Sequence, residues 1–419
     1  MATPVSRVDL KASACRFCGT PLNRTFADLG AAPPSNSYLR AADLRRSELY
    51  HPLHAYVCDS CHLVQLEEFE TPERIFSDYA YFSSYSRSWL SHCEAYCRAM
   101  VARFGLDRSS QVIEIASNDG YLLKNFVPAG IRVLGVEPAV NVARVAMDRG
   151  IPTMVAFFGR ETAKRLVGNG VKADLLVANN VMAHVPNLND FVGGMKLVLA
   201  PKGVVTVEFP HLLNLIREVQ FDTIYHEHFS YFSFMTANAV FAAHGMRLFD
   251  VEKLPTHGGS LRIYGCHADA DMETHESVTA LLEEERAGGL GDSAAYAGFE
   301  EKIRAVKRSL LRFLIDAQES GRSVAGYGAA AKGNTLLNYC GIGPELVEYV
   351  VDANPHKQGL YLPGSHIPVH APERIGETRP DYILILPWNL QEEIVSANAH
   401  VAGWGGRFVV PIPEVRILP

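Results

Sequence analysis

The sequence predicts an α/β protein with a small metal-binding domain at its N-terminus and two Rossmann-like domains after it. Two CxxC pairs lie near the start of the chain, and separate strand–turn–helix units begin near residues 111 and 323. Between and after these units, short β-branched segments alternate with helical ones, which is typical of right-handed βαβ units around a parallel sheet. The 419 residues are enough for two to four domains of ordinary size.

The composition favours a folded, multidomain protein. Apolar residues make up 48% of the chain and charged residues 20%, which excludes wholesale disorder. The 39 basic and 46 acidic residues give a net charge of −7, and this argues against nucleic acid as the main partner. The sequence has no apolar stretch of about 18 residues and no apolar signal segment near its start, so we expect a cytoplasmic protein without a membrane partner. No heptad pattern is evident, and we expect a monomer.

Four cysteines in two CxxC pairs predict a zinc site: Cys15, Cys18, Cys58 and Cys61. Each spacing lets a tight turn aim two thiolates at one ion, and the four sulfurs form the tetrahedral set that Zn²⁺ prefers. A closed set of four leaves no position for water, so this zinc is expected to be structural. Iron–sulfur ligation is one alternative, and haem attachment is another because His62 completes a CxxCH pattern. Cys93 and Cys97 are expected to be buried thiols on a helix.

The middle of the chain predicts a nucleotide-like cofactor. A strand over 111–116, a turn over 117–120 and a helix from Tyr121 form the first unit, and the next strand ends at Glu137. A helix over 139–149 and further strands near Thr153 and over 173–178 and 203–208 continue the alternation. Ligands of parallel sheets bind at the carboxyl ends of the strands. Glu137 lies at such an end, where a carboxylate can accept hydrogen bonds from both ribose hydroxyls.

The turn of this unit favours S-adenosylmethionine (SAM) over NAD. It is not GxGxxG, because Ala116, Asn118 and Asp119 replace glycines and only Gly120 remains. Glycines allow the close approach of a pyrophosphate, and SAM carries a ribose and an adenine but no phosphate. A doubly wound domain without a cofactor is the alternative. Cofactor binding is therefore assigned to six residues near the strand ends: Glu114, Ala116, Asn118, Gly120, Glu137 and Asn179.

Titratable side chains cluster over 225–231, in the sequence YHEHFSY. Histidine exchanges protons near neutral pH, and a tyrosine hydroxyl can hydrogen-bond an oxyanion. His184 follows the strand over 173–178 and is therefore expected near the cofactor crevice. The pattern is not HExxH, but metal binding by His226 and His228 remains an alternative, as does an ordinary polar helix end. His257, in a His-Gly-Gly-Ser loop, is either a substrate contact or part of a plain turn.

The last third of the chain predicts the second Rossmann-like domain. Apolar residues recur at helical spacing over 299–318, and a strand and a glycine-containing turn follow over 323–335. The turn permits an anion to approach backbone amides and a helix N-terminus, and Lys332 adds positive charge. Further strands are expected over 347–351 and 382–386. Tyr327 and Lys332 are therefore candidates for binding substrate, with pure packing of the turn as the alternative.

The order of these motifs resembles one family along essentially the whole chain. The motifs are CRFCG and CDSC, YAYFSSYS from Tyr79, EIASNDGYLL from Glu114, NVMAHV, YHEHFSY and GYGAAAKG. They are similar to those of the SAM-dependent C-methyltransferases of deoxysugar biosynthesis, above all the C-3′-methyltransferases of the tetronitrose-pathway type. That resemblance implies a zinc domain over 1–80, a SAM domain over 81–250 and a Rossmann-like domain over 251–419. It also implies that a dTDP-linked 3-amino-4-keto-trideoxy sugar, used in antibiotic biosynthesis, binds between domains.

The resemblance further implies five catalytic residues, all present here: Tyr79, His184, Tyr225, Glu227 and His228. A keto group at C-4′ acidifies the C-3′ hydrogen, and the resulting enolate carbon attacks the SAM methyl. We expect His228 to be the base, with Glu227 tuning or orienting it, and Tyr79, Tyr225 and His184 to hold the keto oxygen or the sugar. Tyr225 or a bound water is the alternative base.

The motifs leave three other functions open. C-5′ methylation of a related 4-keto sugar nucleotide is not separated from C-3′ methylation, because both subgroups look similar in these motifs. An NAD(P)-dependent sugar-nucleotide oxidoreductase would use the C-terminal glycine turn. A non-catalytic, zinc-bearing interaction protein would retain only the fold, although the intact Glu137 and the intact polar cluster argue against this.

Overall fold

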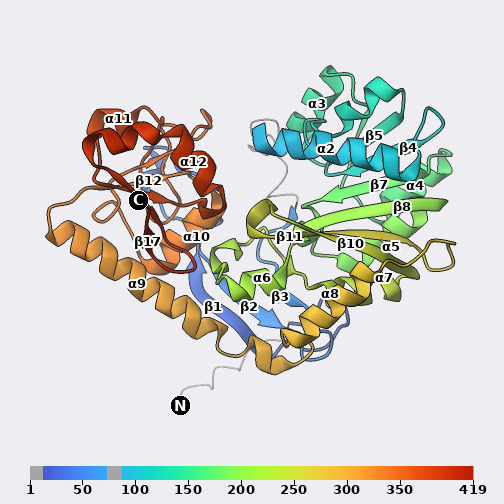
Figure 1. Ribbon diagram of the computed structural model, residues 1–419, viewed down its shortest axis with the longest axis horizontal. Helices are drawn as coiled ribbons and strands as arrows, with labels where there is room; N and C mark the ends of the chain where they lie inside the picture. Colours follow the sequence, from blue (N-terminus) through green and yellow to red (C-terminus); the bar gives the residue numbers. More distant parts are fainter. Residues whose placement is uncertain (1–12, 73–86, 419) are drawn as a thin grey trace, which may run out of the picture.

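The computed structural model describes residues 13–72 and 87–418, which form three β-sheets (Figure 1). The seven-stranded and six-stranded sheets lie on opposite sides of the molecule in this view, and the N-terminal strands lie below and between them. The expected α/β class, with an N-terminal metal-binding domain and two Rossmann-like domains, is confirmed. Among the described residues, no helix is long and apolar enough to cross a membrane.

The N-terminal sheet is antiparallel and is completed by a segment from far along the chain. Its order is β1-β2-β3-β9, with β1 at Arg24–Ala32, β2 at His51–Val57, β3 at Val64–Leu66 and β9 at Ser230–Tyr231. Strand β9 pairs with β3, so that Val64 lies opposite Tyr231. The residues just before β9 are those of the YHEH motif. The N-terminal sheet therefore fixes the position of that motif.

The middle sheet has seven strands in the order β10-β11-β8-β7-β4-β5-β6. In chain order these are β4 Gln111–Ile115, β5 Arg132–Glu137, β6 Thr153–Val155, β7 Ala173–Asn179, β8 Leu199–Pro210, β10 Met246–Leu254 and β11 Ser260–His267. The strands from β6 to β8 in this order are parallel to one another. Strand β11 pairs antiparallel with β8, and β10 pairs antiparallel with β11, so that β10 runs in the same direction as β8. Strand order reverses between β4 and β7, the position where such sheets bind ligands. Because β11 pairs with β8, the sheet continues past residue 250, where the sequence placed a domain boundary.

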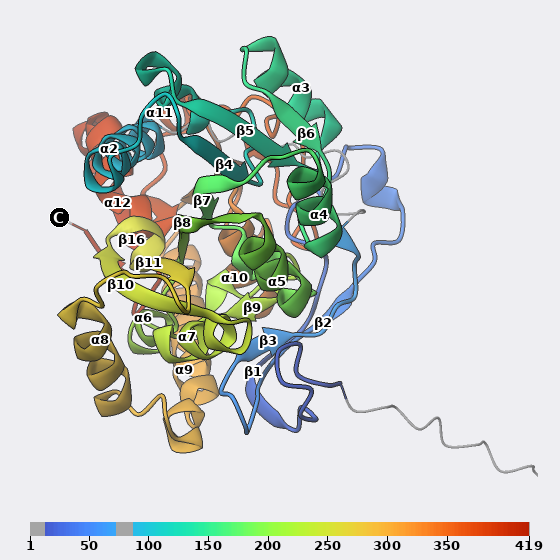
Figure 2. The same cartoon turned by 90° about the vertical axis from the view of Figure 1, so that its right-hand side faces the viewer.

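Side chains that alternate along the strands give this sheet two buried faces. On β4, Val112 joins the apolar cluster under helix α2, whereas Ile113 and Ile115 join the cluster under α4 and α5. Figure 2 shows α2 on one side of the sheet and α4 and α5 on the other. The helices of this part are α2 Arg87–Phe104, α3 Val140–Asp148, α4 Arg160–Gly168, α5 Leu188–Val198, α6 Leu212–Arg217, α7 Phe234–Ala243 and α8 Glu276–Ala287.

The helix expected from Tyr121 is wrong. Two short 3₁₀ turns follow β4 instead, at Leu123–Asn125 and Val127–Ala129. Pro128 has no N–H for an α-helical hydrogen bond, and its ring would clash with the carbonyl of Lys124. The apolar residues of this segment are still buried, since Leu122, Leu123 and Phe126 are fully enclosed under α2.

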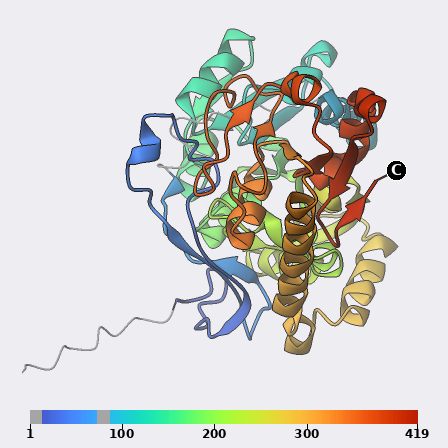
Figure 3. The ribbon, with the colours of Figure 1, turned by 90° about the vertical axis from the view of Figure 1, so that its left-hand side faces the viewer.

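The C-terminal sheet has six strands in the order β14-β13-β12-β15-β16-β17, and only β17 is antiparallel. The strands are β12 Val324–Tyr327, β13 Val350–Val351, β14 Val369–His370, β15 Tyr382–Ile385, β16 Arg407–Val410 and β17 Arg416–Ile417. The helices are α9 Phe299–Glu319, α10 Ala331–Cys340, α11 Arg374–Thr378 and α12 Gln391–Ala397. Figure 3 shows α9, the longest of them, crossing this side of the molecule.

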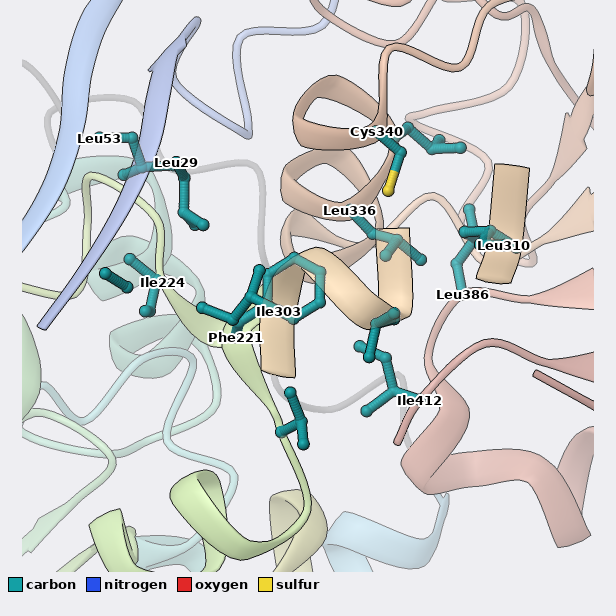
Figure 4. Packing of buried hydrophobic residues seen from close by; sticks show 14 of the residues in the cluster. Leu29, Leu53, Phe221, Ile224, Ile303, Leu310, Leu336, Cys340, Leu386 and Ile412 are labelled. Atoms are coloured by element: carbon teal, nitrogen blue, oxygen red, sulfur yellow. The ribbon is translucent and has the colours of Figure 1, made fainter. Parts of the chain in front are cut away.

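One apolar cluster connects the three sheets, and Figure 4 shows its centre. Leu29 and Leu53 come from the N-terminal sheet, Phe221 from the middle part, and Leu336 and Leu386 from the C-terminal part. All five side chains are buried. Apolar burial is the main stabilising term in folding, so the three parts are held together by a common core and not by polar contacts alone.

Candidate active site and zinc centre

The four cysteines of the CxxC pairs converge on one point. The sulfurs of Cys15 and Cys61 are 3.6 Å apart, those of Cys18 and Cys58 are 3.5 Å apart, and all four lie within 4.8 Å of one another. A tetrahedron with Zn–S bonds of about 2.3 Å has sulfur–sulfur edges of about 3.8 Å, so the geometry fits zinc. Gln65 donates a hydrogen bond to Cys15 Sγ at 3.2 Å, which favours the thiolate that zinc requires.

The turn after β4 has the backbone conformation of a glycine-rich loop, although few of its residues are glycines. Ala116, Asn118 and Gly120 have φ values of 55°, 49° and 77°, all in the left-handed region. Asparagine tolerates this conformation better than most residues, and alanine less well. At Gly120 a β-carbon would also lie 2.9 Å from Cγ1 of Ile151. The fold therefore needs this backbone shape although the sequence supplies only one glycine for it.

Glu137 lies at the end of β5 and secures this turn. Its Oε2 accepts from the Asn118 amide at 2.9 Å, and its Oε1 accepts from the Ala139 amide at 2.8 Å. Burial raises the pKa of the Glu137 carboxyl, and the two backbone amides oppose that shift. Each carboxylate oxygen has two acceptor positions, so both retain one for a ribose hydroxyl.

Several buried polar atoms beside this turn have no hydrogen-bond partner among the described residues. They are Glu114 Oε2, Ser117 Oγ, both amide atoms of Asn179 and Oδ1 of Asn180. Burial raises the pKa of the Glu114 carboxyl well above its usual range, and the charges of Glu137 and Asp119 add to the shift. Buried polar groups are rarely left without partners in native proteins. Such a set at the carboxyl ends of β4 and β7 fits the hydroxyl, amino and carboxylate groups of SAM.

Tyr225 and His228 form a hydrogen-bonded pair in the YHEH motif. His228 Nδ1 lies 2.9 Å from the Thr223 carbonyl oxygen, and Nε2 lies 2.8 Å from the Tyr225 hydroxyl. A carbonyl oxygen only accepts, so Nδ1 carries the proton of the neutral ring and Nε2 accepts from the hydroxyl. The His184 ring meets the His228 ring edge to face, with centroids 4.6 Å apart. The structure thus brings together Tyr225, His228 and His184 from two distant segments.

The imidazoles of this site are held neutral. Burial lowers the pKa of His184 to about 4, and a hydrogen bond to the Glu227 backbone opposes the shift. Burial also lowers the pKa of His228 well below its usual value, and nearby His184, His257 and Lys332 lower it further. A neutral imidazole is the form that accepts a proton, so the site suits general-base chemistry at neutral pH.

The Glu227 carboxylate is hydrogen-bonded to the N-terminal part. Its Oε1 accepts from Asn36 Nδ2 at 2.6 Å, and Asn36 belongs to the loop after β1. Burial raises the pKa of Glu227 to about 7, with Asn36 and the positive charge of Lys357 opposing. The contacts that orient the His228 ring come from Thr223 and Tyr225, not from the Glu227 carboxylate.

The predicted substrate residues of the C-terminal part occupy different environments. Lys332 lies in the interdomain region, where its Nζ donates to Asn389 at 2.8 Å and sits 4.7 Å from the Trp388 ring. The Trp388 indole donates in turn to buried Asp222, whose pKa burial raises to about 6 against the opposing charge of Lys332. Tyr327 packs against the apolar cluster of the C-terminal sheet.

Two further predictions concern the loops. His257 is exposed and has a φ of 55°, and its ring centroid lies 5.7 Å from that of Trp89. In the glycine turn after β12, the Ala329 amide already donates to Asp352 at 2.7 Å. Tyr79 lies outside the described residues. Cys93 and Cys97 lie on α2 as buried thiols, as expected.

Sequence reasoning missed the residues that act across long sequence distances. Asn36 contacts Glu227, Asp222 contacts Trp388, and a buried cluster joins His92 and Arg262 to Glu208 at 3.0 and 2.6 Å. Asn36, Asp222, His92 and Arg262 do not belong to any of the motifs described above. Their partners are 54 to 191 positions away, so only the folded chain reveals the pairs.

Comparison with known proteins identifies the family. Residues 15–76 match a putative zinc binding domain, residues 89–250 a methyltransferase domain, and residues 255–413 a C-methyltransferase C-terminal domain. The chain is 38% identical to the C-methyltransferase NovU of Streptomyces niveus over 407 residues, which is 96% of each chain. The chain belongs to the C-methyltransferase family. This C-methyltransferase is therefore an enzyme that uses SAM, and its predicted four-cysteine zinc site is confirmed.

More distant matches are partial. An uncharacterized methyltransferase of Mycobacterium leprae is 29% identical over 98 residues, covering 23% of this chain and 36% of that protein. The SAM-bound magnesium protoporphyrin IX methyltransferase of Synechocystis matches 42% of this chain and 79% of its own, at 12% identity and a TM-score of 0.33. The PH0226 protein of Pyrococcus horikoshii matches 48% of this chain and 99% of its own, at 15% identity and a TM-score of 0.36.

Proposed function

We propose that this C-methyltransferase methylates C-3′ of a dTDP-linked 3-amino-4-keto-2,3,6-trideoxy sugar, in the biosynthesis of an antibiotic deoxysugar. The observation that carries the proposal is the Tyr225–His228 pair beside His184. It combines a hydroxyl that can turn to a keto oxygen with a neutral imidazole that can take a proton. Carbon methylation next to a ketone needs both groups at adjacent atoms.

The reaction follows from these groups in three movements. The Tyr225 hydroxyl turns from His228 Nε2 to the C-4′ keto oxygen, which frees the nitrogen lone pair. His228 Nε2 then takes the C-3′ proton, and the electron pair of the C–H bond forms an enolate whose oxygen is hydrogen-bonded by Tyr225. SAM, held by Glu137 and the polar groups at the carboxyl ends of β4 and β7, would supply the electrophilic methyl group to this enolate carbon, with S-adenosylhomocysteine as the other product.

The surrounding residues support this sequence of steps. His184 packs against the His228 ring and restricts its orientation, and the Thr223 carbonyl holds the proton on Nδ1. As Nε2 gains a proton, the Thr223 carbonyl also stabilises the imidazolium. By the resemblance of their motifs, we assign to Tyr79 a role in holding the keto oxygen or the sugar, and to Glu227 a role in tuning His228.

We further propose that Lys332 and the turn over 326–333 contact the diphosphate of the nucleotide, between the middle and C-terminal domains. The support is the position of the ammonium: it is half-buried, and desolvation lowers its pKa against the opposing charge of Asp222. A bound diphosphate would add negative charge next to the Lys332 ammonium. The proposed division of the chain is a zinc domain over 1–80, a SAM domain over 81–250 and a C-terminal domain over 251–419, with β11 contributed to the middle sheet.

The proposed function is tested by mass spectrometry of a dTDP-4-keto-3-amino sugar incubated with the enzyme and SAM. We expect the mass of one added methyl group, and NMR of the product to place it on C-3′. A methyl at C-5′ would overturn the assigned position, and no methyl transfer to this substrate would overturn the substrate class. We expect His228→Asn to lower turnover by about 10²-fold or more while calorimetry shows SAM still bound. His400→Asn, which changes an exposed histidine of the C-terminal part, is the matched control and should retain turnover.

A further inference from the structure

Arg16 connects the zinc centre to both histidine-bearing segments of the active site. It lies between Cys15 and Cys18, inside the first CxxC turn. The backbone N–H of Arg16 donates to Gln65 Oε1 at 2.9 Å. The side-chain nitrogen of Gln65, Nε2, in turn donates to Cys15 Sγ at 3.2 Å. The position of Arg16 is therefore set by the metal-binding turn itself.

The guanidinium of Arg16 reaches the segment that carries His184. One amino group donates to the Pro186 carbonyl at 2.9 Å, two residues beyond that histidine. The return contact comes from Asn189, whose side-chain amide donates to the carbonyls of Arg16 and Phe17 at 3.2 and 2.9 Å. Three hydrogen bonds thus join the first CxxC turn to the segment over 184–189, across about 170 positions of sequence.

The same guanidinium also faces the segment that carries His228. Its carbon lies 5.4 Å from the ring centroid of Phe229, within cation–π range. Its other amino group donates to the Leu66 carbonyl, and the Leu66 amide donates to the Phe229 carbonyl at 3.0 Å. The Phe229 amide donates to the Ala183 carbonyl at 2.8 Å, which joins the two histidine segments to each other. Arg16 therefore contacts both histidine-bearing segments, and these two segments are also hydrogen-bonded to each other.

Charge explains why arginine suits this position. The guanidinium of arginine is positively charged at neutral pH. A zinc ion with four thiolates carries a formal charge of −2, which a neighbouring guanidinium partly offsets. A planar group with five donors can also serve two carbonyls and a ring face at once, which a lysine ammonium cannot.

We propose that Arg16 is a positioning residue that transmits the geometry of the zinc turn to His184 and His228. On this view the zinc domain aligns the imidazoles for catalysis as well as stabilising its own fold. The catalytic consequence rests on the proposed function, because it assumes that these histidines serve the methyl transfer. The structural part of the inference does not depend on the identity of the substrate.

The test compares Arg16→Gln and Arg16→Lys with a matched control, Arg24→Gln. Arg24 lies on the same domain and pairs with Asp59 of the second CxxC turn, but both side chains are largely exposed. Zinc content, SAM affinity, kcat and KM would be measured for each protein. The imidazole NMR signals of His184 and His228 would be followed in histidine-labelled enzyme, with assignment by single substitutions.

We expect Arg16→Gln to keep one zinc per chain and nearly unchanged SAM affinity, and to lose roughly 10- to 100-fold in kcat. The signals of His184 and His228 should shift, Arg16→Lys should show a smaller change, and Arg24→Gln should show neither change. Unmoved histidine signals and unchanged kcat in zinc-loaded Arg16→Gln would overturn the proposal. If the sugar nucleotide is not a substrate, the NMR comparison still decides the role of Arg16 by itself.

Discussion

Acid is predicted to destabilise this C-methyltransferase through its buried imidazoles, and His184 offers the clearest test. Burial lowers the pKa of His184 to about 4 in the folded protein, whereas histidine in an unfolded chain titrates near about 6.5. Between these values the unfolded chain binds a proton that the folded chain does not. Each pH unit of acidification across that interval costs about 1.4 kcal/mol of unfolding free energy.

The sign and the size of the effect follow from this interval. The contribution of His184 to stability is complete above about pH 6.5 and is lost as the pH falls toward about 4. From about pH 7.5 to about pH 5 the loss amounts to about 1 to 2 kcal/mol, once the partial accessibility of the ring is allowed for. The His184→Gln variant has no titrating ring at this position and should not show that loss.

The assay is urea unfolding of the zinc-loaded enzyme at both pH values. The stability of the wild type should fall by about 1 to 2 kcal/mol more than that of His184→Gln. Val185→Ala alters the same segment without removing an imidazole and should fall as much as the wild type. Loss of zinc in acid affects all three proteins, so it cancels in the comparison. Equal losses in wild type and His184→Gln would refute the inference that His184 is neutral in the folded site.

Three further outcomes are expected. Gly120→Ala places a β-carbon 2.9 Å from Ile151 at a φ of 77°. Urea unfolding should therefore show a decrease of about 1 to 3 kcal/mol in the free energy of unfolding. A variant as stable as the wild type would contradict the need for glycine at this position. Cys58→Ser removes a zinc ligand, and elemental analysis with thermal unfolding should show less zinc and a lower Tm, whereas full zinc content would exclude Cys58 as a ligand. Lys332→Ala should raise KM for the sugar nucleotide with a smaller effect on kcat; an unchanged KM would remove Lys332 from the diphosphate site.

The zinc site and the cofactor turn could be predicted from sequence because their information is local. Cys15 and Cys18 are separated by the two residues that a metal-binding turn requires, and the structure needs no unusual contact to bring them together. Glu137 was likewise identified by its place at the end of a strand, and its carboxylate lies beside the turn as expected. Strand–turn–helix patterns predicted both Rossmann-like sheets for the same reason.

The prediction of a helix from Tyr121 is wrong because Pro128 prevents the α-helical conformation that the strand–turn–helix pattern indicated. The segment has the apolar residues of a buried helix, and these are buried, but Pro128 limits it to 3₁₀ turns. The expected helix is therefore replaced by 3₁₀ turns that still bury the apolar side chains of the segment.

The contacts of the active site could not be predicted from local patterns. The pairing of Asn36 with Glu227 spans 191 positions, and that of Arg16 with Pro186 spans 170. A hydrogen bond of this kind depends on how the three sheets pack. The residues next to Asn36 or Arg16 in the sequence do not distinguish them from an Asn or Arg that is exposed to solvent. Resemblance of motifs identified Glu227, but only the fold shows that its carboxylate is hydrogen-bonded to Asn36.

The removal of a proton by His228 is tested most directly by hydrogen exchange at C-3′. A dTDP-4-keto-3-amino sugar would be incubated in D₂O with the enzyme and S-adenosylhomocysteine, which occupies the cofactor site without a transferable methyl group. NMR would then follow replacement of the C-3′ proton by deuterium. We predict enzyme-dependent exchange by the wild type and exchange about 10²-fold slower or less with His228→Asn. Exchange at the wild-type rate by His228→Asn would contradict the assignment of His228 as the base.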